Sequence, residues 1–304
     1  MTLTQLSIFI KVIDLQNFSK AAEELYITQP AVSHSISDLE SELSIKLIQR
    51  EKNKIFLTDT GTKVLKHARI ITYHAEQIKQ EAASSLGLQA GMLKIGSFGS
   101  VSANLLPGIM HLFKLKYPKI DLKIFEGTEN EVRDWISSRM IDIGFVTLPC
   151  RTLKTVFIVS DDMMVVLSEK HPLSSEKSVN IEQLNEYPVM ITWSSNCQIL
   201  VKKAFKSFTG KFPPWKYKVS NIATMLGMVK EELGIAVIPE FAIPKDISHI
   251  KILQIEPKLK RGIGLASLTP FKDSTPTVLA FIEIAKEWIK KQGGLQNSAS
   301  IRKF

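Results

Sequence analysis

One side of a predicted helix over residues 28–43 carries short polar side chains that suit contacts with a DNA duplex. An amide such as Gln29 can pair with the edge of adenine, and hydroxyls can donate to bases or phosphates. His34 would be a donor directed at the groove. The alternative is an exposed histidine that contacts only phosphate or water, since roughly half or more of such contacts go to the DNA backbone. We expect four residues of this helix to bind DNA: Gln29, Ser33, His34 and Ser37.

Short helices must position these side chains. Apolar residues recur at three- and four-residue steps through residues 3–13, which predicts a first amphipathic helix. Ser19 is the expected N-cap of a second helix over 20–26, and Thr28 is the expected cap of the third. Pro30 is tolerated there, because the amides of the first helical turn have no intrahelical partner to lose. The side of the third helix opposite the polar residues carries the apolar stripe Val32, Ile36, Leu39 and Leu43.

Two short strands, 47–50 and 55–58, predict a basic hairpin after the third helix. Three helices followed by such a hairpin form a winged helix-turn-helix, in which the recognition helix enters the major groove and the wing contacts the DNA backbone. Residues 1–91 carry ten Lys/Arg and ten Asp/Glu, but 46–54 hold four cations and one acid. Arg50 could instead pair with Glu51 or another acid. The DNA-binding residues expected in the wing are Arg50 and Lys52, which would bind phosphates or probe the minor groove, and Asn53 at the turn.

A long helix is predicted from about residue 60 to 85, where proline does not occur. Its small and apolar residues are spaced 4, 3, 4, 3 and 4 along the chain, which is a heptad seam of the kind that packs helix against helix. We expect a dimer, because a long helix between two domains has little else to cover its stripe. The alternative is a helix packed on its own domain. The seam consists of Val64, Ala68, Ile71, Ala75, Ile78 and Ala82.

From Met92 the predicted strands and helices alternate, which implies a sheet with parallel strands covered by helices. In such sheets, ligands bind beyond the carboxyl ends of strands, where loops lead into helix N-termini. Gly99 lets the backbone approach a ligand, and hydroxyls beside free helical amides suit a carboxylate or another anion. The alternative for this loop is an ordinary helix cap by Ser100 or Ser102. The residues expected to bind a small anionic effector are Ser97, Gly99, Ser100, Thr128, Thr147, Ser194 and Ser195.

Length and composition exclude several classes of protein. With 304 residues, 44% hydrophobic and 23% charged, the chain is expected to form about two globular domains. No stretch approaches the ~18 apolar residues of a membrane span, and the N-terminus lacks the features of a signal peptide, so we expect a cytoplasmic protein without a membrane partner. The two cysteines, Cys150 and Cys197, could form a redox switch. We expect two unrelated thiols instead, because nothing nearby predicts a lowered thiol pKa.

Signatures of catalysis and cofactor binding are incomplete. The segment 262–267 is half of a dinucleotide fingerprint, and it lacks the third glycine and the acid that should follow. Ser97 has no glycine two residues before it, as a nucleophile elbow requires. The six histidines show no spacing typical of metal ligands. We therefore expect no enzyme activity, no catalytic residue, no metal and no cofactor apart from the effector.

The chain closely resembles the LysR-type transcriptional regulators. The resemblance is most specific in the first sixty residues, where it is carried by Phe18, Ala21, Ala22, Leu25, the QPAVS run over 29–33, Ile36, Leu39, Glu40, Leu47, Arg50, Leu57, Thr58 and Gly61. Segments such as LKIGSFGS, IDLKIFEG, IDIGFV and GIAVIP extend a weaker likeness over nearly the whole chain. Three residues depart from the family pattern. Asn17 replaces a serine, Ser44 replaces the glycine that ends the recognition helix, and Ile48 replaces a phenylalanine of the wing.

The resemblance implies an effector-responsive regulator that binds double-stranded promoter or operator DNA, forms a homodimer or homotetramer and contacts RNA polymerase. It implies a winged helix-turn-helix over 1–58 and a linker and dimerisation helix over 59–87. An α/β effector domain like the periplasmic binding proteins follows, with one subdomain over 92–161 plus 266–304, a second over 162–265, and a small co-inducer in the cleft between them. The rival interpretation is a cytoplasmic α/β solute-binding or enzymatic protein with an accessory helical module.

Overall fold

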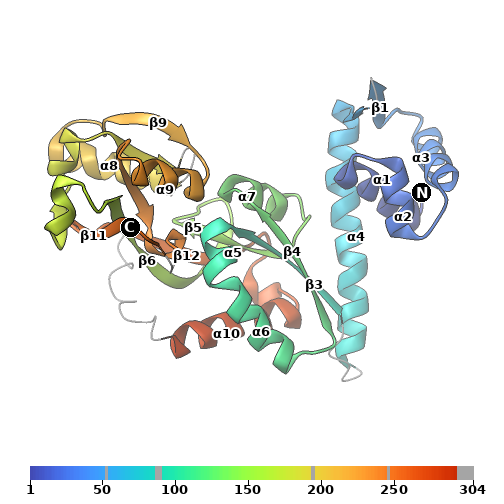
Figure 1. Ribbon diagram of the computed structural model, residues 1–304. Helices are drawn as coiled ribbons and strands as arrows, with labels where there is room; N and C mark the ends of the chain where they lie inside the picture. Colours follow the sequence, from blue (N-terminus) through green and yellow to red (C-terminus); the bar gives the residue numbers. More distant parts are fainter. Residues whose placement is uncertain (52–53, 86–90, 193–195, 245–246, 293–304) are drawn as a thin grey trace. The chain divides into compact units, whose positions relative to one another are not determined.

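The computed structural model describes residues 1–51, 54–85, 91–192, 196–244 and 247–292 (Figure 1). The chain divides into two compact units, residues 1–91 with 137–140, and residues 92–136 with 141–304. The first unit contains α1 (Leu3–Leu15), α2 (Phe18–Leu25), α3 (Gln29–Leu43), β1 (Ile48–Glu51), β2 (Lys54–Leu57) and α4 (Asp59–Ser85). This order of elements is that of a winged helix-turn-helix followed by a long helix.

Side-chain caps set the ends of the first helices. Thr2 and Gln5 form a capping box at α1, and Thr28 accepts a hydrogen bond from the Ala31 amide at α3, as predicted. Asn17, not Ser19, caps α2, because its Oδ1 accepts from the Lys20 amide at 2.9 Å. A capping side chain serves an amide two or three residues on, so the helix begins at residue 18 rather than 20.

Apolar faces of all four helices meet in one core. The buried members include Phe9, Val12 and Ala21 from the first two helices, and Val32, Ile36 and Leu39 from α3. Ser44 ends α3 with a φ of 55°, so the left-handed C-cap is present although the residue is not glycine. The hairpin β1–β2 is antiparallel, with residue 48 opposite 57 and residue 51 opposite 54.

The second unit is built on a sheet of ten strands with helices on both faces (Figure 1). Its helices are α5 (Gly99–Asn104), α6 (Leu106–Lys116), α7 (Glu129–Ser137), α8 (Asn196–Thr209), α9 (Ile222–Lys230) and α10 (Pro276–Lys291), with 3-10 turns η1 (Pro172–Ser175), η2 (Gln183–Glu186), η3 (Glu240–Ala242) and η4 (Phe271–Asp273). The strands are β3 (Gly91–Phe98), β4 (Ile120–Gly127), β5 (Ile143–Leu148), β6 (Lys154–Ser168), β7 (Ser178–Asn180), β8 (Val189–Thr192), β9 (Trp215–Val219), β10 (Ile235–Pro239), β11 (Ile250–Glu256) and β12 (Lys260–Ser267).

The sheet contains the expected parallel pairs and antiparallel pairs as well, so it is a mixed sheet. Its order is β4-β3-β5-β12-β6-β10-β8-β9, and β11 pairs with β6 and β7. The pairs β3–β5, β8–β10 and β8–β9 are parallel, whereas β12 runs antiparallel to β5 and β6, and β6 antiparallel to β10. β12 lies between β5 and β6 and runs antiparallel to both, so β5 and β6 have the same direction without pairing with each other. The direction of β12 is thus set by strands far away in the chain, which local sequence signals do not show.

The long strand β6 belongs to two cores. Its residues 154–162 pair with β12, and residues 163–168 pair with β10 and β11. One hydrophobic cluster draws on residues 93–159 and 263–289, and another on residues 163–259. This division of the core supports the predicted change of subdomain near residue 161, which stays a prediction.

Helices cover both faces of the sheet around each core. Alternate residues of β5 face opposite sides, so Ile143 and Phe145 pack with α6 and α10 while Val146 packs with α7. Two short helices, α5 and α6, follow β3 where one continuous helix could have formed. The break precedes Pro107, whose ring has no amide hydrogen to bond to the previous turn.

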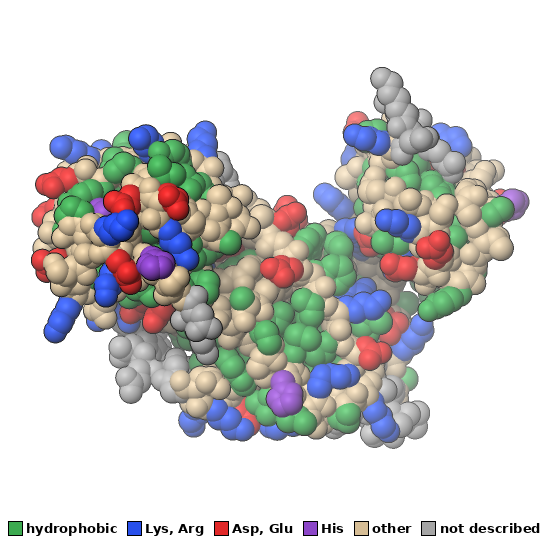
Figure 2. All heavy atoms as spheres, viewed as in Figure 1, with side chains coloured by type: hydrophobic (Ala, Val, Ile, Leu, Met, Phe, Trp, Pro, Cys, Tyr) green, Lys and Arg blue, Asp and Glu red, His purple; other side chains and the backbone are tan. Residues whose placement is uncertain are grey.

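Charged side chains of both signs are interspersed over the visible surface of the second unit, and do not form a patch of one sign (Figure 2). Among the described residues, no helix combines the length and the apolar character that crossing a bilayer requires.

Candidate DNA-binding and ligand-binding sites

The polar side of α3 is exposed to solvent. Gln29 donates from Nε2 to Ser33 Oγ at 2.8 Å, and His34 Nδ1 lies 2.8 Å from Asp38 Oδ2. The His34 side chain is 80% exposed, and Ser37 is exposed one turn away. Four predicted DNA-binding residues therefore share one accessible face. Asp38 also lies there, and the sequence analysis missed it. As an i,i+4 partner, this acid can orient the imidazole of His34.

Glu40 joins α3 to the wing. Its carboxylate is buried and accepts hydrogen bonds from the backbone amides of Leu47 and Ile48, at 2.8 and 3.1 Å, and from Lys46 Nζ at 2.6 Å. Burial raises the pKa of Glu40, but these hydrogen bonds and the charge of Lys46 outweigh it and leave the pKa below the ordinary value of 4.5. The wing residues Lys52 and Asn53 and the side chain of Arg50 lie outside the described residues.

The predicted seam of α4 divides into two parts. Ala68 is buried in the core of its own unit and Val64 packs against that core, so these two residues follow the alternative of a helix packed on its own domain. Further along, Ile71 is 40% exposed and Ile78 is 68% exposed. Ala75 is half-buried and Ala82 exposed. The outer part of the seam is thus more exposed to solvent than its first two residues.

A cavity of about 300 Å³ lies in the second unit at the ends of several strands. Three predicted effector residues line it, Gly99, Ser100 and Thr128. A Cβ added to Gly99 would meet no atom within 4 Å, so the backbone there faces open space. Around them stand Phe98, Gly127, Glu129, Asn130, Thr192, Cys197, Ser220, Ile222, Pro239, Ala242 and Arg261. The lining combines residues of both predicted subdomains.

Other predicted effector residues do not reach the cavity. Ser97 is completely buried, and its hydroxyl has no hydrogen-bond partner among the described residues. Neighbouring residues of a strand face opposite sides, so Phe98 lines the cavity and Ser97 turns away. Thr147 lies behind the lining and donates to Glu129 Oε1 at 2.7 Å. Ser194 and Ser195 lie outside the described residues, between the lining residues Thr192 and Cys197.

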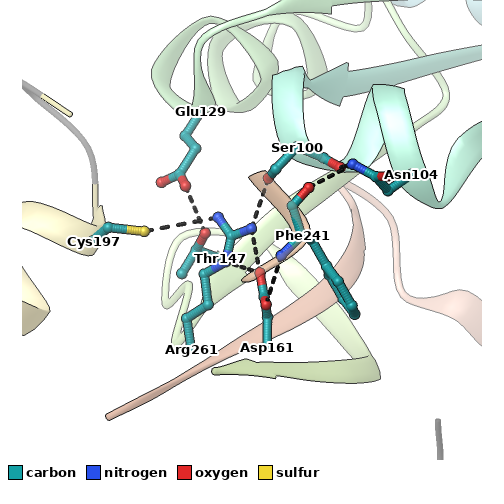
Figure 3. A network of polar contacts seen from close by, with 8 residues as sticks. All are labelled: Ser100, Asn104, Glu129, Thr147, Asp161, Cys197, Phe241 and Arg261. Carbon is teal, nitrogen blue, oxygen red and sulfur yellow. Dashed lines mark hydrogen bonds and ion pairs between the residues drawn. The ribbon is translucent and has the colours of Figure 1, made fainter. Parts of the chain in front are cut away.

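Arg261 is the centre of a buried polar network beside the cavity (Figure 3). Its Nε and Nη2 donate to Asp161 Oδ2 at 2.8 and 2.6 Å, and Nη2 also donates to Ser100 Oγ at 2.6 Å. The side chains of the ion pair are 3% and 0% exposed. Asp161 also accepts from the Phe241 amide at 3.1 Å. Burial raises the pKa of Asp161 above 3.8, and the guanidinium opposes this shift.

Glu129 faces the same cavity from the first turn of α7. Its Oε2 accepts from the Asn196 amide, the first residue of α8, at 3.3 Å. Because Glu129 and Asn196 belong to different predicted subdomains, this contact spans the site. Sequence reasoning missed Glu129, Asp161 and Arg261. A signal existed for the last two, because they are opposite charges in the otherwise largely apolar segments that form β6 and β12.

The two cysteines are both free and buried. Burial raises the pKa of the Cys197 thiol to about 11, and the nearby Arg261 guanidinium only partly offsets it. This shift is the reverse of what a reactive cysteine needs. No group of three or more potential metal ligands occurs among the described residues.

A larger cavity of about 630 Å³ adjoins the first and shares its residues Ser100, Ser220 and Ile222. It lies against α5 and α9, with Asn104, Leu226 and Lys230 in its lining. Asn104 Nδ2 donates to the Phe241 carbonyl at 2.6 Å and so ties the two sides of this region together.

A helix-turn-helix unit followed by an α/β unit with a ligand-sized cavity defines a ligand-regulated DNA-binding protein. The family models described as "Bacterial regulatory helix-turn-helix protein, lysR family" and "LysR substrate binding domain" match residues 3–62 and 86–290. The chain therefore belongs to the LysR family of transcriptional regulators, and its second unit is the effector-binding domain of that family.

Relatives and solved structures agree with this assignment. The chain is 36% identical to the "Uncharacterized HTH-type transcriptional regulator YvbU" of Bacillus subtilis, over 94% of this chain and 98% of the relative. It is 32% identical to YoaU of the same organism, with the same coverage. These relatives are named as transcriptional regulators, not as enzymes. The fold resembles a full-length OxyR variant of Pseudomonas aeruginosa, with a TM-score of 0.76, 24% identity and coverage of 95% of this chain and 98% of that chain. It also resembles CbnR in complex with its target DNA, with a TM-score of 0.68, 20% identity and coverage of 95% and 100%.

Proposed function

We propose that α3 is the recognition helix and enters the major groove of promoter or operator DNA. The observation that carries this proposal is the separation of its two sides, because Val32, Ile36 and Leu39 are buried while the side bearing His34 and Ser37 is exposed. Glu40 fixes the start of the wing relative to α3, so Arg50 and Lys52 would follow the helix onto the phosphates.

The cavity lined by Ser100, Thr128 and Arg261 is the proposed effector site. Its volume of about 300 Å³ suits a small molecule, and donors from hydroxyls and a guanidinium suit a carboxylate or another anion. Contacts that span the site, such as Glu129 to Asn196, would change when a ligand binds. A ligand that prefers one arrangement of the two subdomains would then change the affinity for DNA by linkage.

The outer seam of α4 is the proposed contact between subunits, which would present two recognition helices to a partly symmetric operator. The chain would act in the cytoplasm and, once bound, contact RNA polymerase. A homodimer or homotetramer would satisfy this geometry.

Fluorescence anisotropy tests the separate roles of the recognition helix and the wing. The full-length protein is titrated with a DNA duplex that it binds and with duplexes in which that sequence is mutated. Arg50→Ala should weaken binding to all sequences alike and reduce the salt slope by about one, because one phosphate contact is lost. His34→Ala should instead reduce the preference between sequences. If Arg50→Ala affected only one sequence, the proposed role of the wing would be wrong.

A further inference from the structure

We propose that Glu129 makes the cavity selective for a zwitterion, a small molecule of the amino-acid class whose ammonium group binds Glu129 and whose carboxylate binds Arg261. The inference rests on the proposed function of this cavity as the effector site. The proposal adds that the ligand must carry a cationic group. The hydroxyls of Ser100 and Thr128 do not impose this requirement, and an effector that is only an anion would not meet it.

Glu129 supplies the acceptor side of the site. The residue is 9% exposed and lines the cavity. A carboxylate offers about four acceptor positions, and Glu129 uses one for Thr147 Oγ1 and one, at the longer distance of 3.3 Å, for the Asn196 amide. None of the ion pairs among the described residues includes Glu129. A buried carboxylate without a cation is costly, so an ammonium group from a ligand would be stabilising here.

Arg261 supplies the donor side. Asp161 and Ser100 occupy Nε and Nη2, but the partner of Nη1 among the described residues is Cys197 Sγ at 3.7 Å. A thiol sulfur is a weak acceptor, and a carboxylate oxygen would be a far stronger partner for the same N–H groups. The donor capacity left on Nη1 is therefore directed to the side where Cys197 and the cavity lie (Figure 3).

The balance of charge distinguishes a zwitterion from a simple anion. Asp161 already neutralises Arg261 through two hydrogen bonds, so the pair together brings no net charge to the site. The Glu129 carboxylate therefore gives the site one negative charge more than its positive charges. An anion would gain from Arg261 but be repelled by Glu129, whereas a zwitterion satisfies both groups. A cavity of about 300 Å³ is large enough for a molecule of amino-acid size.

Matched sets of ligands test this selectivity on the full-length protein. The probes are the twenty common L-amino acids, and for each amino acid that binds, the 2-hydroxy acid and the amine with the same side chain. A thermal-shift screen selects binders, and isothermal titration calorimetry gives dissociation constants. We expect at least one amino acid to bind tenfold or more tightly than its 2-hydroxy acid, because that analogue leaves Glu129 without a cation.

Glu129→Gln should reduce this preference for the amino acid to less than threefold, since the amide removes the charge and keeps the shape. Glu126→Gln is the matched control, because Glu126 is an exposed carboxylate on β4 outside the cavity lining, and should leave the preference unchanged. If Glu129→Gln does not fold, Thr147→Val provides a second variant that removes one hydrogen bond from the carboxylate.

The proposal is overturned if the wild-type protein binds a 2-hydroxy acid as tightly as its amino acid, if Glu129→Gln keeps the full preference, or if none of the twenty amino acids binds. Failure of the proposed function is distinct. If simple carboxylates bind in the cavity and alter DNA binding, the effector site stands and only its selectivity for zwitterions is wrong. If neither ligands nor DNA bind specifically, the proposed function itself is wrong.

Discussion

At the scale of single residues, Glu40 shows how a buried carboxylate can fix the position of one element against another. It holds the first two amides of the wing and the ammonium group of Lys46. Hydrogen bonds to a charged acceptor are stronger than neutral ones, and losing this acceptor leaves two buried donors unsatisfied. We therefore infer that Glu40 fixes the angle between the recognition helix and the wing.

Replacing Glu40 with alanine should loosen the wing. We expect the free energy of local opening at the Leu47 and Ile48 amides to fall by about 2 kcal/mol at pH 7, measured by native-state hydrogen exchange of the full-length protein. Glu23→Ala is the control, because Glu23 is an exposed residue of α2 outside this network. Unchanged exchange of the two amides in Glu40→Ala would show that the carboxylate does not hold the wing.

The same residue predicts a pH dependence. The pKa of Glu40 is lower in the fold than in the unfolded chain, so its contribution is complete above about pH 4.5 and is lost as the pH falls through the lowered value. The difference in thermal midpoint between wild type and Glu40→Ala should accordingly shrink between pH 5 and pH 3. A difference that grows in acid would contradict this assignment.

Cys197 leads to a prediction about redox chemistry. With a pKa of about 11, roughly 0.1% of the thiol is ionised at pH 8, against roughly a quarter for an ordinary cysteine. We expect iodoacetamide at pH 8 to label Cys197 at least a hundredfold more slowly in the folded protein than in guanidinium chloride, as followed by mass spectrometry. Rapid labelling of the native protein, or a disulfide between Cys197 and Cys150 after mild oxidation, would revive the interpretation of a redox switch.

At the scale of elements, periodicity predicted most of the N-terminal unit from the sequence. The positions of α1 and α3 followed from apolar spacing and the cap at Thr28, because those signals are local. The mixed sheet could not be predicted in the same way, because the direction of a strand depends on which distant strand it joins. The pairing of Asp161 with Arg261 is likewise set by the register of β6 against β12, a hundred residues apart in the chain.

The effector site shows the same limit. Local sequence signals identified Gly99, Ser100 and Thr128, since each lies where a strand leads into a helix. Glu129 looked like an ordinary first-turn acid of a helix, and only the fold brings it to Asn196 and Thr147. Ser97 was expected to face the ligand, but side chains alternate along a strand, so its neighbour Phe98 faces the cavity instead.

The exposed seam of the linker helix α4 leads to a prediction about the association of two subunits. The Ile78 side chain of the seam is 68% exposed, so Ile78→Glu should place a charge in the proposed contact between subunits. Analytical ultracentrifugation at micromolar concentration should then show a shift to the monomer by tenfold or more in the dissociation constant. Lys79→Glu, which adds an acid to another face of the helix, should not. Equal effects of both variants would move the contact away from the seam.

At the scale of the whole molecule, β6 and β12 pass through the centre of the second unit and carry the ion pair between Asp161 and Arg261. β6 contributes to both cores, and the cavity lies beside the ion pair. A ligand that engages Arg261 on one side and Glu129 on the other would therefore bind where the two predicted subdomains meet. This placement is how a small molecule could control a regulator whose DNA contacts lie in a separate unit.

Regulation by this protein depends most on recognition of a DNA sequence by the polar side of α3. Selection of duplexes from a random pool by the full-length protein, followed by sequencing, measures this directly. We expect enrichment of a partly symmetric motif whose half-sites lie about 10 base pairs, or a multiple of that, apart. We further expect the variant with His34 and Ser37 both replaced by alanine to lose this preference while keeping nonspecific binding. A pool that remains random after repeated selection, or an unchanged motif in the double variant, would contradict the account.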